Sequence, residues 1–481
     1  MELLYILCVP ILAAAGSLIP GARILAPGIT LISSMSVLIL SFQTALRTTT
    51  IKEVIAIPDW IACDSFGALI LVLVALVGFA AAIFSWGYID KIRETRDGII
   101  VRPYYALFNL FLASMLAVPL LSQVALVWIA VELTTLLSVF LVSFASTPEA
   151  LEAAWKYVVL TCMGASIALL GILMLYWGMM SADSQEPFTW AGLTMASSKM
   201  SPALLNTAFF FILIGFGAKV GLVPLHTWLP DAHSQAPSPI CALLSGVETT
   251  VVLYAIMRLS PLFSGMSAAS TGMWLVIFGL VSTGAAALLL IQAKDYKRLF
   301  AFSTVEHMGI ILVAVGVGGF GAHFGAMLQI VGHSLAKALC FFAAGMTLLV
   351  TGNRDIGSIR GLIRTSPISG FFLMLGGLGI AGAPPLAIFL SELSILKAGL
   401  AGGRYLVTGL LALFIVIAFS GILFKINHMV FGKPTMMLKT NLPATCVVAV
   451  VIVTLPVILF GVYIPGTVYD LLRLAAYSIG R

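Results

Sequence analysis

Long apolar segments follow one another along almost the whole chain. About fourteen of them are present, at roughly 2–20, 23–43, 66–88, 104–120, 123–145, 156–178, 203–225, 237–258, 272–292, 298–317, 322–350, 367–398, 404–426 and 443–464. A helix needs about 20 apolar residues to cross a bilayer, and long unbroken runs do not fit the short alternating strands of a membrane β-barrel. The sequence therefore predicts an all-α polytopic membrane protein, with residues 1–481 forming a single membrane domain.

The composition excludes a soluble enzyme. Hydrophobic residues make up 61% of the chain and charged residues 9%, whereas soluble domains have about 45–50% and about 25%. The six cysteines are scattered singly, and there is no Gly-rich phosphate loop or haem-attachment motif. We therefore expect no cofactor, no metal and no redox catalytic site in this chain.

The loop charges predict the orientation of the chain. With the N-terminus placed outside, fifteen Lys and Arg residues fall on the cytoplasmic side, namely Arg23, Lys91, Arg93, Arg96, Arg102, Lys156, Lys294, Lys297, Arg298, Arg354, Arg360, Arg364, Lys425, Lys433 and Lys439. Only seven fall on the other side, namely Arg47, Lys52, Lys199, Arg258, Arg404, Arg473 and Arg481. By the positive-inside rule both termini lie outside a plasma membrane. The net charge of +6 thus reflects topology and does not indicate a nucleic-acid partner.

The two ends of the chain carry further expectations. The first apolar run lacks a basic n-region and a cleavage site, so we expect it to be retained as the first span. Residues 466–481 are expected to form a short interfacial helix.

Ionisable and polar side chains interrupt many of the apolar segments. A charge at the bilayer midplane costs about 2.5–3.5 kcal/mol on insertion scales, so these groups are expected to face one another or internal water. They are Glu132, Lys219, Glu248, Glu306, His307, Gln329, His333, Lys337, Glu392 and Lys397. A polar set spread over so many spans is typical of an ion path, although a buried stripe that only holds helices together is the plainer alternative.

Spacing and chain breakers strengthen the ion-path interpretation. Gln329, His333 and Lys337 are four residues apart, which places them on one face of one helix. Pro224 follows Lys219 closely, and a Gly- and Pro-rich run at 379–385 precedes Glu392. Broken helices of this kind mark ion sites in transporters.

A lysine beside a carboxylate can hold and release a proton. The reference pKa of lysine is about 10.4; burial lowers the pKa of a lysine, and a carboxylate at about 4 Å raises it again. Glu132 and Lys219 are candidates for such a pair. His226 and His233 lie near Asp231 in a Pro-rich stretch, where a metal site is possible but a role in proton entry or loop packing fits better.

Several motifs then reveal a family resemblance. They are KVGLVPLHTWLPDAHSQAPSPICALLSG, WIAVELTT, DYKRLFAFSTVEHMG, HSLAKALCFF and GAPPLAIFLSEL. With them the chain resembles the antiporter-like subunits of respiratory complex I, of Mrp Na⁺/H⁺ antiporters and of group 4 membrane-bound [NiFe] hydrogenases. LEAAWKYVVL, EHMG and NHMVFG make it most similar to the F component of hydrogenase-4 and formate hydrogenlyase-type complexes.

The resemblance implies a specific architecture. It implies fourteen spans, with three first spans in 1–103, inverted five-helix repeats in 104–258 and 272–426, and a last span and tail in 427–481. It implies broken seventh and twelfth helices. A proton path is implied through Glu132, Lys219, His333, Lys337 and Glu392, with Glu132 paired to Lys219.

The sequence departs from the family pattern in the eighth span. Thr250 occupies a position where many members have Lys or His, and Glu248 lies two residues earlier, on a different helix face. Gln329 also stands where some members have His. The link from Lys219 to the second half would then need water near Thr250, or Glu248 together with His307.

We therefore predict a proton-translocating membrane subunit of a redox-driven complex. Its partners would be other membrane subunits and a peripheral redox arm that carries the Ni–Fe and Fe–S clusters, in a hydrogenase, a formate hydrogenlyase or a quinone-reducing relative of complex I. A non-redox ion module is the alternative, either a Na⁺/H⁺ antiporter subunit or the membrane partner of an inorganic-carbon uptake system. A structural scaffold with an inactive channel is a third hypothesis, which Thr250 favours and the buried lysines oppose.

Overall fold

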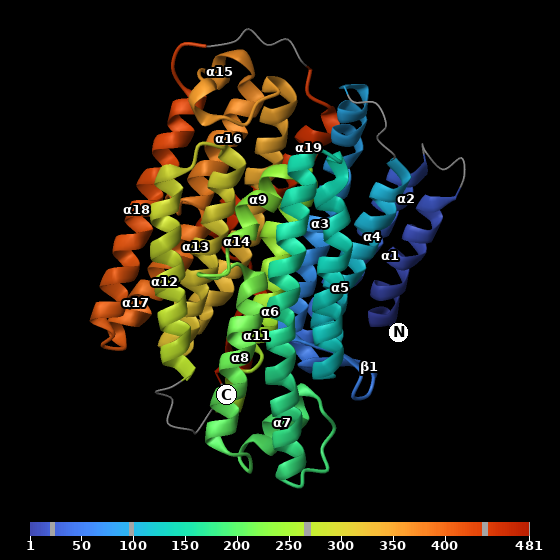
Figure 1. Cartoon of the computed structure of the whole chain (residues 1–481), viewed down its shortest axis with the longest axis vertical. Helices are drawn as coiled ribbons and strands as arrows, with labels where there is room; N and C mark the ends of the chain where they lie inside the picture. Colours follow the sequence, from blue (N-terminus) through green and yellow to red (C-terminus); the bar gives the residue numbers. More distant parts are fainter. Residues whose placement is uncertain (20–24, 96–100, 264–270, 435–440, 481) are drawn as a thin grey trace.

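The first part of the chain forms a helical group with one small hairpin. The structure, a computed structural model, describes residues 1–19, 25–95, 101–263, 271–434 and 441–480. The helices run roughly along the long axis of the molecule (Figure 1). The first elements are α1 (Glu2–Leu18), α2 (Leu25–Ile51), β1 (Glu53–Ile57), β2 (Ile61–Asp64) and α3 (Ser65–Thr95). The two strands pair antiparallel, with Glu53 opposite Asp64.

The middle part of the chain contains the first interrupted helix. Its helices are α4 (Val101–Ala117), α5 (Val124–Val142), α6 (Pro148–Ser181), α7 (Trp190–Ser197), α8 (Pro202–Val220), α9 (Trp228–Gln235), α10 (Ser238–Leu243) and α11 (Thr249–Met257). A π-helical turn, Leu244–Glu248, joins α10 to α11, so that the three segments form one continuous helix.

The last part of the chain contains the second interrupted helix. Its helices are α12 (Thr271–Gln292), α13 (Tyr296–Val317), α14 (Phe320–Thr351), α15 (Leu362–Thr365), α16 (Pro367–Ile380), α17 (Ala387–Ala401), α18 (Tyr405–Val430), α19 (Ala444–Val462) and α20 (Gly466–Ile479). Short 3₁₀ turns lie at Val118–Leu120, Ser143–Ala145, Ser260–Phe263 and Ile356–Ser358.

The all-α membrane architecture is confirmed. Within the described residues, 12 helices are long and apolar enough to cross a membrane. The 17-residue helix α1 and the broken pair α16–α17 add two further apolar segments, which agrees with the expected number of about fourteen spans. Between the predicted apolar segments 23–43 and 66–88, α2 continues to Ile51 and a β hairpin follows, which the apolar pattern did not predict.

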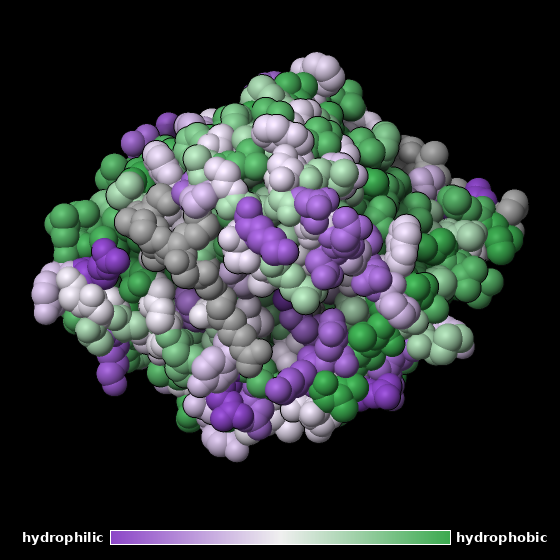
Figure 2. Space-filling model, turned by 90° about the horizontal axis from the view of Figure 1, so that it is seen from below, coloured by the Kyte–Doolittle hydropathy of each residue, from purple (hydrophilic) through white to green (hydrophobic). Residues whose placement is uncertain are grey.

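Burial separates central helices from peripheral ones. In the helix formed by α10, the π turn and α11, the most apolar stretch of 18 residues is completely buried. The corresponding stretches of α13 and α14 are each 83% buried. The corresponding stretch of α18 is only 22% buried, and the exposed side chains of this helix include Leu413, Val416 and Phe424. Seen from one end, hydrophilic residues gather on the end face and hydrophobic residues along the rim (Figure 2). This distribution suits a bundle whose sides contact lipid and whose ends contact water.

The C-terminal segment forms the expected helix. Helix α20 covers Gly466–Ile479 and contacts α3 and α14. It buries Leu472, Ala475 and Ala476 and leaves Arg473 partly exposed. One apolar face thus packs on the bundle while the opposite face remains polar.

Candidate functional site

The break between α8 and α9 positions the first buried lysine. Lys219 lies in the last turn of α8, two residues before Gly221, whose φ of +88° ends the helix in the left-handed region. A side chain at Gly221 would also meet Leu229, since a Cβ there would lie 2.5 Å from Leu229 Cδ1. Glycine is therefore required at this position for two reasons, its positive φ and its close contact. The expected interruption of this span is confirmed.

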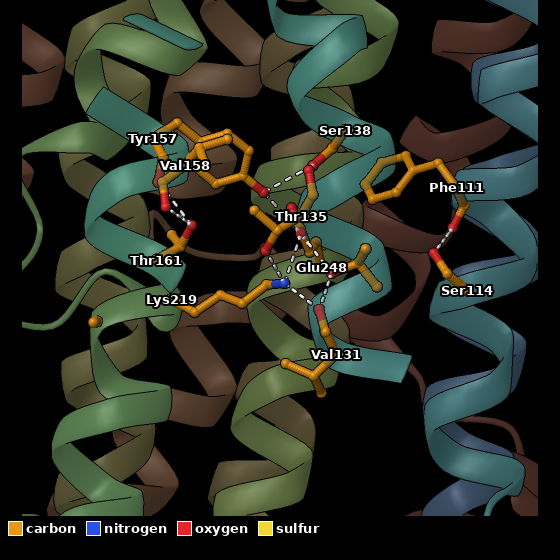
Figure 3. Close-up of polar contacts among 12 residues, drawn as sticks. Phe111, Ser114, Val131, Thr135, Ser138, Tyr157, Val158, Thr161, Lys219 and Glu248 are labelled. Carbon is orange, nitrogen blue, oxygen red and sulfur yellow. Dashed lines mark hydrogen bonds and ion pairs between the residues drawn. The ribbon is translucent and has the colours of Figure 1, made fainter. Parts of the chain in front are cut away.

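Lys219 is held by a polar cluster from two neighbouring helices (Figure 3). Its Nζ donates hydrogen bonds to Val131 O and Thr135 Oγ1 of α5. It also lies 3.6 Å from Glu248 Oε1, and both side chains are only 2% exposed. At this distance an ammonium and a carboxylate attract each other by roughly 4–5 kcal/mol at an effective dielectric of 20. Lys219 therefore has a carboxylate counter-ion beside it.

Glu248 is fixed by hydroxyl groups from two helices. Its Oε1 accepts hydrogen bonds from Thr134 Oγ1 at 2.8 Å and from Tyr157 Oη at 3.1 Å. Tyr157 Oη also lies 2.8 Å from Ser138 Oγ. These contacts satisfy one carboxylate oxygen, whereas Glu248 Oε2 is buried without a hydrogen-bond partner. A buried ion pair is stable only when further hydrogen bonds offset its desolvation, and this pair has several.

Glu132 lies beside this cluster and does not form the expected ion pair. Among the described residues, Lys219 pairs with Glu248 and not with Glu132. The Glu132 side chain is partly exposed, interacts with Cys162 on α6 and keeps a buried oxygen, Oε1, without a hydrogen-bond partner. The predicted contact between Glu132 and Lys219 is thus absent from this structure.

Lys337 on α14 forms the second buried lysine centre. It is fully buried, and its Nζ donates hydrogen bonds to Phe300 O and, at 2.6 Å, to Ser303 Oγ, both on α13. Glu306, one turn further along α13, is 3% exposed and has an unpartnered Oε2. No carboxylate lies within ion-pair distance of Lys337 among the residues that the structure describes. The two lysines therefore differ, because only Lys219 has a paired carboxylate.

The stripe predicted on α14 faces a continuous polar region. Gln329, His333 and Lys337 are all fully buried. His333 Nε2 lies 3.0 Å from Ser245 O, and the His333 and His307 rings are 5.2 Å apart. The prediction that these three side chains share one helix face is therefore confirmed.

A hydrogen-bonded chain then leads from His307 to the second break. His307 Nε2 lies 3.0 Å from Ile380 O, and because a carbonyl can only accept, Nε2 must carry the proton and donate it. Gln329 Nε2 donates to the other ring nitrogen, His307 Nδ1, at 3.0 Å. These contacts fit a neutral imidazole with its proton on Nε2. Gln329 Oε1 accepts from Ser391 Oγ on α17. The chain thus connects α13, α14, α16 and α17.

Glu392 lies against the break between α16 and α17. Its side chain is 6% exposed, and Gly382 in the break has a φ of +73°. A Cβ at Gly382 would lie 2.5 Å from Glu392 Oε2. The missing side chain at Gly382 therefore leaves the space that the carboxylate occupies. The expected interruption of this span is confirmed.

The remaining predicted residues divide into internal and external groups. Thr250 is buried, and its hydroxyl donates to Gly246 O of its own helix at 3.1 Å. His233 is buried between Trp228 and Phe341, and neither ring nitrogen has a hydrogen-bond partner.

His226 and Lys397 take no part in the polar contacts described above. His226 lies partly exposed in the break after α8. Lys397 is exposed on α17, so its inclusion among the internal polar groups was wrong. Among the described residues, no three His, Cys, Asp or Glu side chains are grouped as a metal site.

Hydroxyl groups are the part of the site that sequence reasoning missed. Buried hydroxyls surround both lysines and the histidines, from Thr134, Thr135, Tyr157, Ser245, Ser303, Thr304 and Ser391. Five of them occur in ELTT, FST and LSEL, close to the charged residues that were selected, and Ser245 lies three residues before Glu248. Their position next to those charges is the signal that could have identified them.

Comparison with known proteins gives a consistent result. Residues 122–420 match the family described as NADH:quinone oxidoreductase/Mrp antiporter, transmembrane. The chain is 36% identical over 378 residues to a protein named hydrogenase-4 component F homolog from Methylacidiphilum infernorum (isolate V4), covering 77% of this chain and 79% of that one.

Solved structures share the fold over nearly the whole chain. A chain of the membrane-bound sulfane sulfur reductase, an archaeal respiratory membrane complex, superposes with a TM-score of 0.89 at 23% identity and covers 99% of this chain and 97% of its own length. A chain of the Mrp complex from Dietzia sp. DQ12-45-1b gives 0.87 at 18% identity with the same coverage.

Proposed function

Because this chain belongs to the NADH:quinone oxidoreductase/Mrp antiporter membrane family, we propose that it translocates protons as the antiporter-like subunit of a redox-driven membrane complex. The observation that carries this proposal is the line of buried ionisable and polar groups through the bundle. It includes Lys219, Glu248, His333, His307, Lys337 and Glu392. A stripe that served only to hold helices together would not need two buried lysines and their unpartnered carboxylate oxygens.

The chemistry of the line favours protons over sodium ions. Lysine and histidine side chains exchange protons, whereas an ammonium group such as that of Lys219 repels a metal cation. We assign the path to Glu132, Lys219, His333, Lys337 and Glu392, with the hydroxyls and His307 as connecting groups. The two halves of the path would correspond to repeats in 104–258 and 272–426.

We assign the complex to the membrane-bound hydrogenase or formate hydrogenlyase type. Support comes from the similarity to the hydrogenase-4 component F homolog over most of both chains. Ni–Fe and Fe–S clusters would then belong to partner subunits in a peripheral arm. The basic loops would face the cytoplasm, with both termini outside the plasma membrane. An Mrp-type subunit is the second candidate, since a 29% identical stretch of 434 residues is shared with a Na⁺/H⁺ antiporter subunit A1 of Staphylococcus aureus.

The proposal is tested by proton uptake into vesicles that contain the whole native complex. Lys219→Ala should abolish uptake while the redox rate measured with an uncoupler persists, because the lysine lies on the ion path and not in an electron-transfer site. Lys199→Ala removes an exposed lysine before α8 and serves as the matched control. Unchanged uptake in Lys219→Ala would contradict the proposal. Uptake of sodium in place of protons by the unmodified complex would favour the Mrp-type candidate.

A further inference from the structure

A basic cavity lies away from the proton path, where the end of α9, the end of α12, the start of α13 and the segment after α14 meet. Its volume is about 510 Å³, within the range of about 300–1,000 Å³ that is usual for small-ligand pockets. Three basic residues line it, Lys294, Arg298 and Arg354, against one acidic residue, Asp295. The cavity therefore has the size and the charge to hold a small anionic group.

The backbone beside the cavity is fixed by pairing between two connecting segments. Tyr296 N donates to Arg354 O at 3.2 Å, and Ile356 N donates to Lys294 O at 2.8 Å. Two of the three basic residues thus stand on backbone that is hydrogen-bonded in place, which lowers the entropic cost of holding a ligand between them.

The basic side chains keep donors that the protein does not use. Lys294 is exposed and forms no ion pair among the residues that the structure describes. Arg298 contacts Asp231 through Nη2, and Arg354 contacts Ser234 through Nη1. A guanidinium has five N–H donors, so both arginines can still bind the oxygens of a phosphate.

The acidic residue of the cavity is already occupied. Asp295 Oδ1 accepts from the backbone N–H of Lys297 at 2.7 Å, and its Oδ2 accepts from Ser234 Oγ at 2.7 Å. Asp295 therefore serves as the N-cap of α13, and the three basic groups are left to attract an anion.

One wall of the cavity is apolar and continues onto the side of the bundle. Leu289 of α12 and Phe302 of α13 line this wall. Next to them on α12, Leu288 is 57% exposed and Ile291 is 52% exposed. A soluble anion would use only the basic part of the cavity, whereas a phospholipid would use both parts, with its phosphate on the basic residues and its acyl chains along α12.

We propose that this cavity binds the headgroup of an anionic phospholipid, with the phosphodiester held by Lys294, Arg298 and Arg354. Basic pockets between membrane helices are suited to anionic lipid headgroups. A zwitterionic lipid fits less well, because its ammonium group would meet the same three positive charges. The inference goes beyond the proposed function and does not depend on it, since it concerns binding and not transport.

The test counts the lipids that the purified whole complex retains, by native mass spectrometry after addition of phosphatidylglycerol or phosphatidylcholine. Lys294→Glu should lose one phosphatidylglycerol relative to wild type and weaken its binding roughly tenfold or more, because each basic residue near an anionic lipid contributes about fivefold in affinity and the reversal changes the charge by two. Lys433→Glu makes the same change at another exposed lysine that does not line the cavity, and should retain the lipid. Equal retention in the two variants would overturn the proposal.

A second variant distinguishes a lipid from free phosphate. Leu289→Trp fills the apolar wall and keeps the three charges, so it should weaken the binding of phosphatidylglycerol several-fold. Leu413→Trp, at an exposed position on α18, is the matched control and should bind as wild type does. If Leu289→Trp bound phosphatidylglycerol normally and inorganic phosphate displaced the lipid from wild type, the cavity would be a site for soluble phosphate and the proposal would be wrong.

Two further outcomes would also overturn the proposal. Equal retention of phosphatidylcholine and phosphatidylglycerol by wild type would show an apolar groove without headgroup recognition. A cavity covered by an acidic segment of a partner subunit would hold no lipid that Lys294→Glu removes. Proton uptake in Lys219→Ala is measured separately, so the lipid site and the proposed function stand or fall independently.

Discussion

The close contact between Gly382 and Glu392 leads to a quantitative prediction for Gly382→Ala. The new Cβ would lie 2.5 Å from Glu392 Oε2 and 3.1 Å from its carboxyl carbon. Ordinary contact needs about 3.5 Å, so the carboxylate must move by roughly 1 Å. Displacements of that size in a positioned group can lower a rate by about 100-fold. The positive φ of +73° adds strain of roughly 1–2 kcal/mol.

A matched glycine separates the contact from the strain. Gly403 has a φ of +70° and no neighbouring atom within 4 Å of a built Cβ. Both Gly382→Ala and Gly403→Ala should lower the thermal stability of the purified complex to a similar extent. Only Gly382→Ala should reduce proton uptake, by roughly tenfold to 100-fold. Equal uptake in the two variants would refute the reasoning that the position of the Glu392 carboxylate matters.

Three further predictions concern stability. Gly461→Ala should destabilise the bundle by about 1–3 kcal/mol or more, because its Cβ would lie 1.8 Å from Pro385 O where α19 packs on the second break; a wild-type melting temperature would contradict it. Arg258→Ala should lower the free energy of unfolding by about 1.5–3 kcal/mol, because it removes the guanidinium that lies 2.5 Å from the Asp64 carboxylate. A fall in melting temperature as small as that expected for an exposed surface ion pair would contradict this prediction. Burial and the Asp64 carboxylate raise the pKa of Glu53 above its ordinary value. The stabilising contribution of protonated Glu53 is therefore lost as the pH rises through that raised pKa, so Glu53→Gln should raise the melting temperature at about pH 8 and not at about pH 4.

The apolar segments predicted the helices closely, because a membrane span needs a continuous apolar run. The segment expected at 322–350 is Phe320–Thr351 in the structure. The segment expected at 367–398 contains its Gly- and Pro-rich break, since α16 ends at Ile380 and α17 begins at Ala387. The β hairpin after α2 was not predicted, because its strands are only five and four residues long.

The partners of the charged residues could be predicted only in part. Spacing on α14 correctly grouped Gln329, His333 and Lys337, since a regular helix fixes which residues share a face. The partner of Lys219 could not be obtained in the same way. It depends on the π turn before Thr249, which changes the direction of Glu248 and has no clear sequence signature. Distances between helices, which decide that Glu132 stays unpaired with Lys219, are also not contained in local spacing.

The central claim is that one continuous proton path crosses both halves of the chain. It is tested most directly by the number of protons translocated per electron in the whole complex, compared for Lys219→Ala, Lys337→Ala and the double variant. A single path in series predicts that each single variant loses as much of this subunit's proton transport as the double variant does. If each single variant retained about half of that transport and only the double variant lost it all, the two halves would act independently, and the account would be wrong.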